Sequence, residues 1–303
     1  ITRPRRFGKT LNMSMLRYFY DNRMDTSTLF SGLKVSEDEE VMKVVNGYPT
    51  IFLTFKDFKN NSWETAFDKL KLLIGDLFRS FMDDLKTVLI DTYEKEYYLK
   101  ILSGNGTVAD YEVSLEKLTE LLYKAYGKQV LLIIDEYDVP IQSGWTYGYY
   151  DDVISFMRGF LSCALKDNSY LYKGILTGIY RVAKESIFSG LNNLKVYTVL
   201  EKKYSTYFGF TEDAVSRLLE LYATKPFEHF KVDLKNWYNG YNFGENIIYN
   251  PWSIINSFSD GELKPYWINT SSNNLIIELI ENNLKDDIVF REEIEQLVAG
   301  KKL

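Results

Sequence analysis

Eight residues decide the fold: residues 129–136, which read QVLLIIDE. The unbroken apolar run at residues 130–134 predicts a strand that is buried on both faces, as in the centre of a parallel sheet. The run ends in Asp135 and Glu136, which places two carboxylates at the carboxyl end of that strand. Open α/β sheets bind ligands at this edge. Polar residues are also common wherever a chain leaves the core, so both interpretations stay open at this point.

The segments around this strand predict the rest of the sheet. Residues 48–56 (YPTIFLTFK) and 171–177 (LYKGILT) have the β-branched and aromatic content of strands. Apolar residues recur at helical spacing between the strands, in residues 62–102, 111–126 and 151–165. Strands that alternate with helices predict right-handed crossovers. We therefore expect an α/β fold, a three-layer sandwich with a mainly parallel sheet.

The pattern changes after about residue 205. Thr211 is expected to cap a helix, and Asn250-Pro251 to open another with an N-cap followed by proline. Residues 237–243 (WYNGYNF) suggest a tight aromatic turn, and further helices are expected from about residue 273 to 303. We predict two domains, an α/β core at 1–205 and a smaller, mostly helical domain at 206–303.

Composition excludes several classes of function. The chain has one cysteine, Cys163, and one histidine, His229, so an intrachain disulfide and a zinc cluster are excluded. The net charge of −6 argues against strong direct binding of nucleic acid through overall charge. No apolar run approaches the roughly 20 residues of a membrane helix. A cytoplasmic protein without a membrane partner is expected.

A second motif lies near the start of the chain. Gly8-Lys9-Thr10 is the end of the phosphate-loop signature G-x-x-x-x-G-K-[ST]. In that signature the glycine lets the backbone approach a phosphate, the lysine reaches the β- and γ-phosphates, and the threonine hydroxyl binds Mg²⁺. Arg3 replaces the first glycine of the signature. The alternative is a surface turn with a solvated lysine. If the loop binds a nucleotide, its candidate contacts are Arg5, Arg6, Phe7, Gly8, Lys9 and Thr10.

The two motifs together favour binding of a nucleoside triphosphate. Asp135 and Thr10 are then the candidate Mg²⁺ ligands, and Glu136 is the candidate general base, with Lys9 as a catalytic charge. Thr177, at the end of the next strand, would sense the γ-phosphate or orient water, although threonine also suits strands by its shape. Arg181 would act as an arginine finger, although most single arginines are surface charges.

Motifs along the whole chain resemble the bacterial AAA-ATPase-like family of predicted ATPases. They are RPRRFGKT (3–10), LLIIDEYDVPI (131–141), LTGIYRVAKESIFSGLNNL (176–194), FGFTEDAV (208–215), WYNGYNFG (237–244), YNPWSI (249–254) and YWINTS (266–271). Arg3 in place of the first glycine is that family's own variant. The resemblance implies a P-loop NTPase core of the additional-strand type, followed by a helical domain. It also places Gly8, Lys9 and Thr10 at the Walker A end, Asp135 and Glu136 at Walker B, and Thr177 at the sensor strand.

Two functions follow, and a third is weaker. The first is Mg²⁺-dependent hydrolysis of ATP. The second is a nucleotide-dependent regulatory switch with little or no hydrolysis. The third, a nucleic-acid-directed machine, depends on the PD-(D/E)XK-type nuclease domain that many family members carry, which would lie beyond Leu303.

The strand that should precede the phosphate loop is missing or reduced to Ile1-Thr2. The sequence is compatible with an oligomer. The motifs FSGLNNL (188–194) and WYNGY (237–241) favour packing of their aromatic side chains over contact with a cofactor.

Overall fold

The sheet of the core is parallel, as the sequence predicts. The computed structural model describes residues 1–266, except residues 90–91, 181–186, 189–190, 192–193 and 223–226. Strands β1 (Thr50–Thr54), β2 (Val130–Asp135) and β3 (Leu171–Thr177) lie in the order β1-β2-β3, all parallel. The central strand β2 is buried along its whole length. The α/β class with a parallel sheet is therefore confirmed.

The strand register and one parallel bridge bring four chain segments to one edge of the sheet. Asp135, the last residue of β2, pairs with Thr54 on one side and with Thr177 on the other. Thr2 forms a parallel bridge with Gly178, directly after β3. The segment that leads into the Gly8-Lys9-Thr10 motif thus lies beside β3. All four segments run in the same direction, so their carboxyl ends share this edge.

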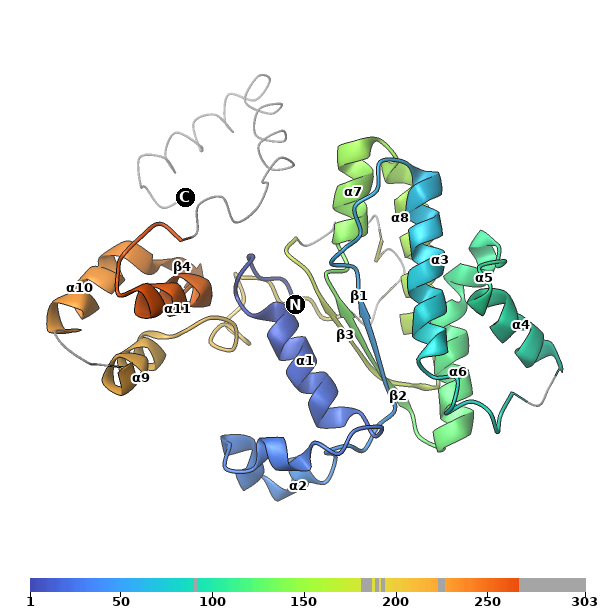
Figure 1. Cartoon of the computed structure of the whole chain (residues 1–303), viewed down its shortest axis with the longest axis horizontal. Coiled ribbons are helices and arrows are strands. Elements are labelled where there is room, and N and C mark those ends of the chain that lie inside the picture. The colour runs from blue at the N-terminus through green and yellow to red at the C-terminus, as the bar shows by residue number, and fades with distance from the viewer. Residues whose placement is uncertain (90–91, 181–186, 189–190, 192–193, 223–226, 267–303) are drawn as a thin grey trace. The chain divides into compact units, whose positions relative to one another are not determined.

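Helices cover both faces of the sheet (Figure 1). On one face, Met13 of α1 packs with Leu131 and Ile133 of β2. On the other face, Leu132 and Ile134 belong to the main core cluster. The alternation follows from the two-residue period of a strand. The helices of the core are α1 (Lys9–Tyr20), α2 (Glu39–Met42), α3 (Trp63–Arg79), α4 (Thr92–Leu102), α5 (Val108–Glu112), α6 (Ser114–Tyr126), α7 (Val139–Tyr147) and α8 (Tyr150–Leu165), with 3-10 helices η1 (Ser27–Phe30) and η2 (Lys34–Glu37).

The segment after β3 contains helices and one hairpin. The helices are α9 (Glu212–Tyr222), α10 (Phe227–Tyr238) and α11 (Pro251–Asp260), and the strands of the hairpin are β4 (Asn239–Phe243) and β5 (Asn246–Tyr249). Asn250 caps α11 through its side chain, as the Asn-Pro pair predicts. The expected aromatic turn at residues 237–243 instead ends α10 and forms strand β4. The turn itself comes at Gly244, whose φ of 58° suits glycine.

The chain divides into two units between Pro265 and Tyr266, and the first unit, Ile1–Pro265, contains nearly all of the described residues. The boundary predicted near residue 205 therefore falls within the first unit, and the division into domains 1–205 and 206–303 stays a prediction. The helices expected over residues 273–303 lie outside the described residues.

Candidate nucleotide site

The loop that opens the chain ends at an uncapped helix. Gly8 is the N-cap residue of α1, with a φ of 75°, and no side chain accepts a hydrogen bond there. The first turn of α1 also has no acidic residue. The first N–H groups of a helix lack partners inside the helix and carry the positive end of its dipole. This end of α1 therefore has the arrangement that binds phosphate groups.

Lys9 is buried at this helix end, with a relative exposure of 6%. Its Nζ donates hydrogen bonds to the backbone oxygens of Arg3 and Pro4, both at 3.0 Å. A lysine has three N–H donors, so these two bonds leave one for a ligand. Burial lowers the pKa of Lys9, while the carboxylates of Asp138, Glu136 and Asp135 oppose this shift. The ammonium group thus holds the loop closed and lies in the field of the acidic sheet edge.

Asp135 joins the two predicted motifs, although they are far apart in the sequence. Its side chain is fully buried. The Thr10 hydroxyl donates to Asp135 Oδ2 at 2.6 Å, and the Thr177 hydroxyl donates to Asp135 Oδ1 at 2.5 Å. The helix after the loop and two strand ends therefore meet at one carboxylate. Lys9, Thr10, Asp135 and Thr177 are the predicted residues that the structure brings together.

The oxygens of Thr10 and Asp135 fit a Mg²⁺ ion that also binds phosphate. Mg²⁺ prefers oxygen ligands, and it usually takes one or two from protein and the rest from water and phosphates. Within the described residues, no group of three or more His, Cys, Asp or Glu side chains could hold a metal ion. Thr10 and Asp135 offer two oxygen ligands, so a Mg²⁺ ion bound there would need its remaining ligands from water or phosphates.

Glu136 occupies a strained position beside this carboxylate. Its φ of 55° lies in the left-handed region, which is rare for residues other than glycine. Such strain is concentrated at functional sites. Burial raises the pKa of the Glu136 carboxyl, and so does Asp135, while the positive charges of Lys9 and Arg5 lower it. The Glu136 carboxyl therefore has a higher pKa than an ordinary glutamate.

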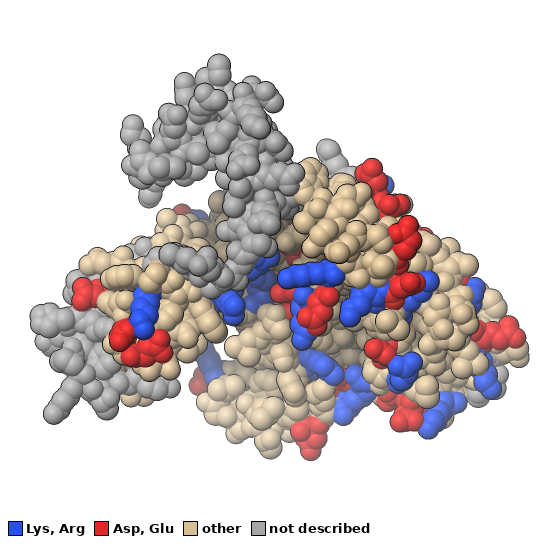
Figure 2. Space-filling model, turned by 45° about the horizontal axis from the view of Figure 1, so that its top comes forward, with Lys and Arg blue, Asp and Glu red and all other residues tan. Residues whose placement is uncertain are grey.

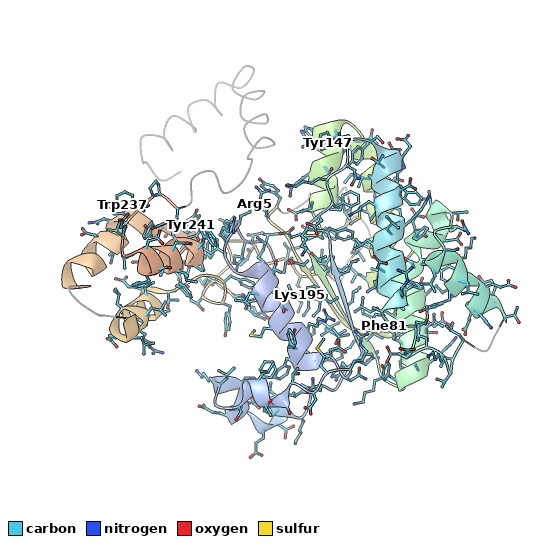
Figure 3. All side chains as sticks on the ribbon, in the orientation of Figure 1. Arg5, Phe81, Tyr147, Lys195, Trp237 and Tyr241 are labelled. Atoms are coloured by element: carbon cyan, nitrogen blue, oxygen red, sulfur yellow. The ribbon has the colours of Figure 1, made fainter. Side chains whose placement is uncertain are left out.

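The arginines of the loop have different surroundings. The charge of Arg5 acts on Glu136 and Lys9, which places it next to the acidic edge, and Figure 3 shows it at the loop before α1. Arg6 is exposed, and its guanidinium carbon lies 4.3 Å from the centre of the Trp252 ring. Phe7 is buried in an apolar cluster with Phe243 and Ile248. The nucleotide contacts predicted for Arg5, Arg6 and Phe7 stay predictions, and the buried Phe7 ring leaves its backbone as its contact with a phosphate. Arg181 lies outside the described residues.

Asp138 is a site residue that the sequence analysis did not single out. Its carboxylate is buried, and Oδ2 accepts hydrogen bonds from the backbone amides of Ile179 and Tyr180, both at 2.9 Å. The Tyr137 hydroxyl donates to the backbone oxygen of Tyr180 at 2.9 Å. Asp138 thus fixes the turn that follows Thr177. In the sequence, Asp138 stands at the N-cap position of α7, two residues before Pro140. This pattern predicts a helix cap and gives no sign of the bonds to Ile179 and Tyr180.

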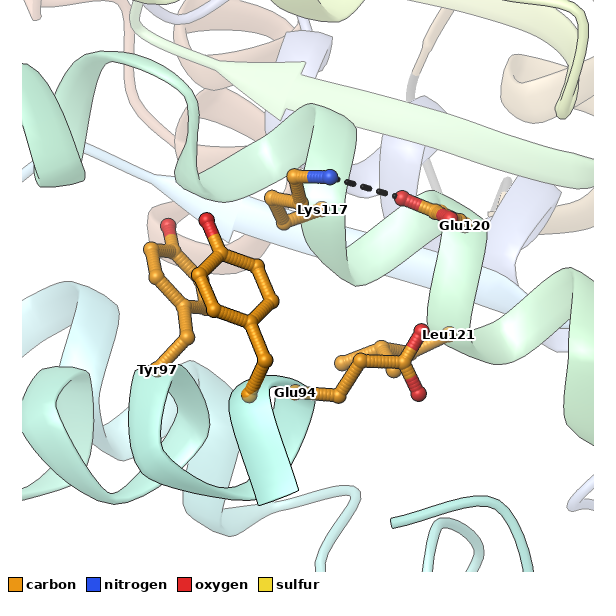
Figure 4. Close-up of a pocket in the computed structure, with 6 residues that line it drawn as sticks. Glu94, Tyr97, Lys117, Glu120 and Leu121 are labelled. Carbon is orange, nitrogen blue, oxygen red and sulfur yellow. Dashed lines mark hydrogen bonds and ion pairs between the residues drawn. The ribbon is translucent and has the colours of Figure 1, made fainter. Parts of the chain in front are cut away.

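A pocket elsewhere in the core lacks these features. It has a volume of about 230 Å³ and lies between α4 and α6 (Figure 4). Its lining residues are Tyr93, Glu94, Tyr97, Lys117, Glu120 and Leu121. Lys117 is already paired with Glu120 at 3.0 Å. None of the predicted site residues lines this pocket, so the geometry at Asp135 is the better guide to the site.

Comparison with known proteins agrees with the geometry. The family model described as "Predicted AAA-ATPase" matches residues 1–188. The chain belongs to this predicted AAA-ATPase family. The family match spans the loop, β2 with its acidic end, and β3, which are the segments that meet at Asp135. The resemblance of the sequence motifs to this family is therefore confirmed. Membership of the family suggests that the chain binds a nucleotide.

One curated relative covers the whole chain. An "uncharacterized protein in vnfD 5′ region" of Azotobacter chroococcum mcd 1 is 25% identical over 305 residues. The match covers 100% of this chain and 52% of that protein, so the chain spans about half the length of the relative. No solved structure matches the chain. Within the described residues, no helix combines the length and apolar character needed to cross a membrane.

Proposed function

We propose that the chain binds ATP with Mg²⁺ between the N-terminal loop and the ends of β2 and β3, and that it hydrolyses the nucleotide. The observation that carries this proposal is the contact of Thr10 with Asp135 at 2.6 Å, beside a buried Lys9. A threonine hydroxyl, a lysine and a buried carboxylate together supply the positive charge and oxygen ligands that a Mg²⁺-bound polyphosphate needs. Under this proposal the core is a three-layer P-loop NTPase fold.

Each residue has a role that its surroundings support. The open end of α1 and the third N–H of Lys9 would bind phosphate oxygens. Thr10 and Asp135 would hold Mg²⁺, which supplies charge neutralisation on the phosphates when bound. Glu136 would accept the proton of the attacking water, because its raised pKa makes it a better base than an ordinary carboxylate. Thr177, bonded to Asp135, would hold that carboxylate in position and orient water.

A regulatory switch with little or no hydrolysis is the second candidate. The observation in its favour is that Phe7, inside the loop, packs on Phe243 of the β4–β5 hairpin, 236 residues further along the chain. A change of the loop on nucleotide binding would therefore reach the hairpin directly. Phosphate release separates the two candidates, because a switch binds nucleotide without releasing phosphate at a useful rate.

The decisive experiment combines isothermal titration with ATP and ADP, with and without Mg²⁺, and a phosphate-release assay. Glu136→Gln should keep nucleotide binding and lose turnover by about 100-fold or more, the size of a general-base contribution. Lys9→Ala should lose binding, while Lys43→Ala, at an exposed lysine of the surface, should bind as the parent chain does. Unchanged hydrolysis by Glu136→Gln would show that Glu136 is not the base. Unchanged binding by Lys9→Ala would refute the site itself.

The expected partners beyond the nucleotide stay predictions. A C-terminal nuclease domain is expected from the family resemblance alone, and the chain spans 52% of the relative's length. Weak binding of nucleic acid is supported by the net charge of −6 and by Figure 2, where basic and acidic side chains are interspersed over the face drawn. A gel shift at low and high salt would test it, since binding through phosphate contacts falls steeply with salt.

A further inference from the structure

The N-terminal loop is bulkier than a phosphate loop needs to be, and its bulky side chains contact residues from the last part of the first unit. We call the residues that the loop contacts the aromatic socket. They are Phe208, Gly209, Tyr241, Phe243, Ile248 and Trp252. All of them except Ile248, which lies in β5, come from three of the sequence motifs to which the nucleotide site assigns no role: FGFTEDAV, WYNGYNFG and YNPWSI.

Phe7 is the apolar anchor of the loop in this socket. Its side chain is 1% exposed. Its ring centre lies 4.8 Å from that of Tyr241 at an angle of 71°, and 5.0 Å from that of Phe243. These separations are in the range of favourable aromatic pairs. A Cβ atom at Gly209 would lie 2.3 Å from Ile248 and 2.9 Å from Phe7, so only glycine allows this packing.

Two arginines of the same loop, Arg3 and Arg6, also reach the socket. The guanidinium carbon of Arg6 lies 4.3 Å from the centre of the Trp252 ring, and that of Arg3 lies 5.2 Å from the centre of Phe243. The φ of Arg6 is 70°, a strained value for a residue with a side chain. Strained positions persist where surrounding contacts hold them. The stacking on Trp252 and the burial of the neighbouring Phe7 are such contacts.

Asn250 sets the position of Trp252. Its side chain accepts a hydrogen bond from the Trp252 amide at 2.9 Å and so caps α11. Trp252 is 40% exposed, so it is open to substitution without loss of the core. Ile255 lies on the same helix with 55% exposure and no place in the clusters around Phe7. It provides a matched control.

We infer that the aromatic socket is the positioning device of the phosphate loop, with Trp252 as a positioning residue that acts through Arg6. The inference rests on the proposed function. In the usual signature, glycines let the loop close around the phosphates; here the socket holds the loop in its strained shape before the nucleotide arrives. The fraction of chains with a competent loop sets the apparent affinity. By reciprocity, nucleotide binding must stabilise the docking of the hairpin on the loop.

The test compares three variants at two readouts. Trp252→Leu removes the aromatic face and should raise the Kd and KM for MgATP about three- to five-fold, the size of a cation–π contact, with kcat within about two-fold. Trp252→Phe restores an aromatic face and should restore most of the affinity, and Ile255→Ala should match the parent chain. In the unmodified chain, MgATP should slow hydrogen exchange of the amides in residues 241–249.

The outcomes separate this inference from the proposed function. A Trp252→Leu chain that binds MgATP like the parent, or Leu and Phe variants that are weakened equally, would overturn the role of the socket. Exchange in residues 241–249 that MgATP leaves unchanged would overturn the coupling, and this measurement needs no variant that must fold. A parent chain that binds no MgATP, or a Lys9→Ala chain that binds it unchanged, would instead refute the nucleotide site.

Discussion

Arg3 offers a sharp test, because Arg3→Gly restores the first glycine of the general phosphate-loop signature. Sequence patterns alone suggest that this change would improve the site. In the structure, however, the Arg3 side chain is fully buried. It donates hydrogen bonds to the backbone oxygens of Thr198 at 2.8 Å, Tyr204 at 2.9 Å and Tyr197 at 3.3 Å. Arg3 therefore joins the start of the chain to residues 197–204.

The expected cost follows from these contacts. Each of these three partly buried carbonyls costs about 1–1.5 kcal/mol when it loses its donor. The Nε of Arg3 has no hydrogen-bond partner among the described residues, which offsets about 1 kcal/mol of this loss. A new glycine adds about 0.5–1 kcal/mol through chain entropy. Arg3→Gly should therefore lower the free energy of unfolding by about 3 kcal/mol, which for a chain of 303 residues is a fall in Tm of about 5 °C.

Thermal denaturation followed by circular dichroism or dye binding measures this fall. Arg3→Lys is the matched variant, because it keeps the charge but not the planar fork that reaches several carbonyls, so its Tm should lie between the other two. Arg3→Gly should also bind MgATP more weakly than the parent chain. A glycine variant that is as stable as the parent and binds MgATP more tightly would refute the structural role of Arg3.

Three further predictions concern the acidic edge. Thr10→Val should weaken Mg²⁺-dependent ATP binding about ten-fold by calorimetry, because the hydroxyl that reaches Asp135 is lost. Thr10→Ser keeps the hydroxyl and should bind normally. Equal affinities of the two variants would exclude Thr10 as a ligand. Since burial raises the pKa of Glu136, its charge destabilises the folded chain above that pKa, so Glu136→Gln should raise Tm at neutral pH. That gain should vanish as pH falls towards the ordinary glutamate pKa of about 4.3, and a gain independent of pH would show another cause. Asp138→Ala leaves two backbone amides without an acceptor and should lower Tm by about 4–10 °C. Asp138→Asn keeps an oxygen for these amides and should leave Tm unchanged. Equal Tm values for the two variants would show that Asp138 does not fix the turn after Thr177.

Much of the core could be predicted from local pattern. The apolar run of β2 and the acidic residues that follow it are contiguous in the sequence, so the strand and its polar end are evident without tertiary information. Parallel strands end at one edge, which brings Asp135 next to Thr177 as the two patterns imply. The contact of Thr10 with Asp135 follows from the same argument once the loop is interpreted as a phosphate-binding turn.

Other features depend on contacts that no local pattern contains. Arg3, a charged residue in a basic segment, suggests exposure or a phosphate contact; its burial depends on carbonyls almost 200 residues away. Asp138 has the position of a helix cap, but its acceptor capacity goes to the amides of Ile179 and Tyr180. The WYNGYNF segment becomes a strand because β5 pairs with it, and pairing partners are a tertiary property.

The amino-acid sequence by itself therefore determined the α/β class, the buried central strand and the residues that meet at the acidic edge, because hydrophobic period and strand direction are local properties. Only the tertiary structure decided which loop residues turn towards that edge and which are held by the socket. The physical reason is that Arg3, Arg6 and Phe7 satisfy their charge and their apolar surface against groups from distant parts of the chain, and the sequence gives no measure of such proximity.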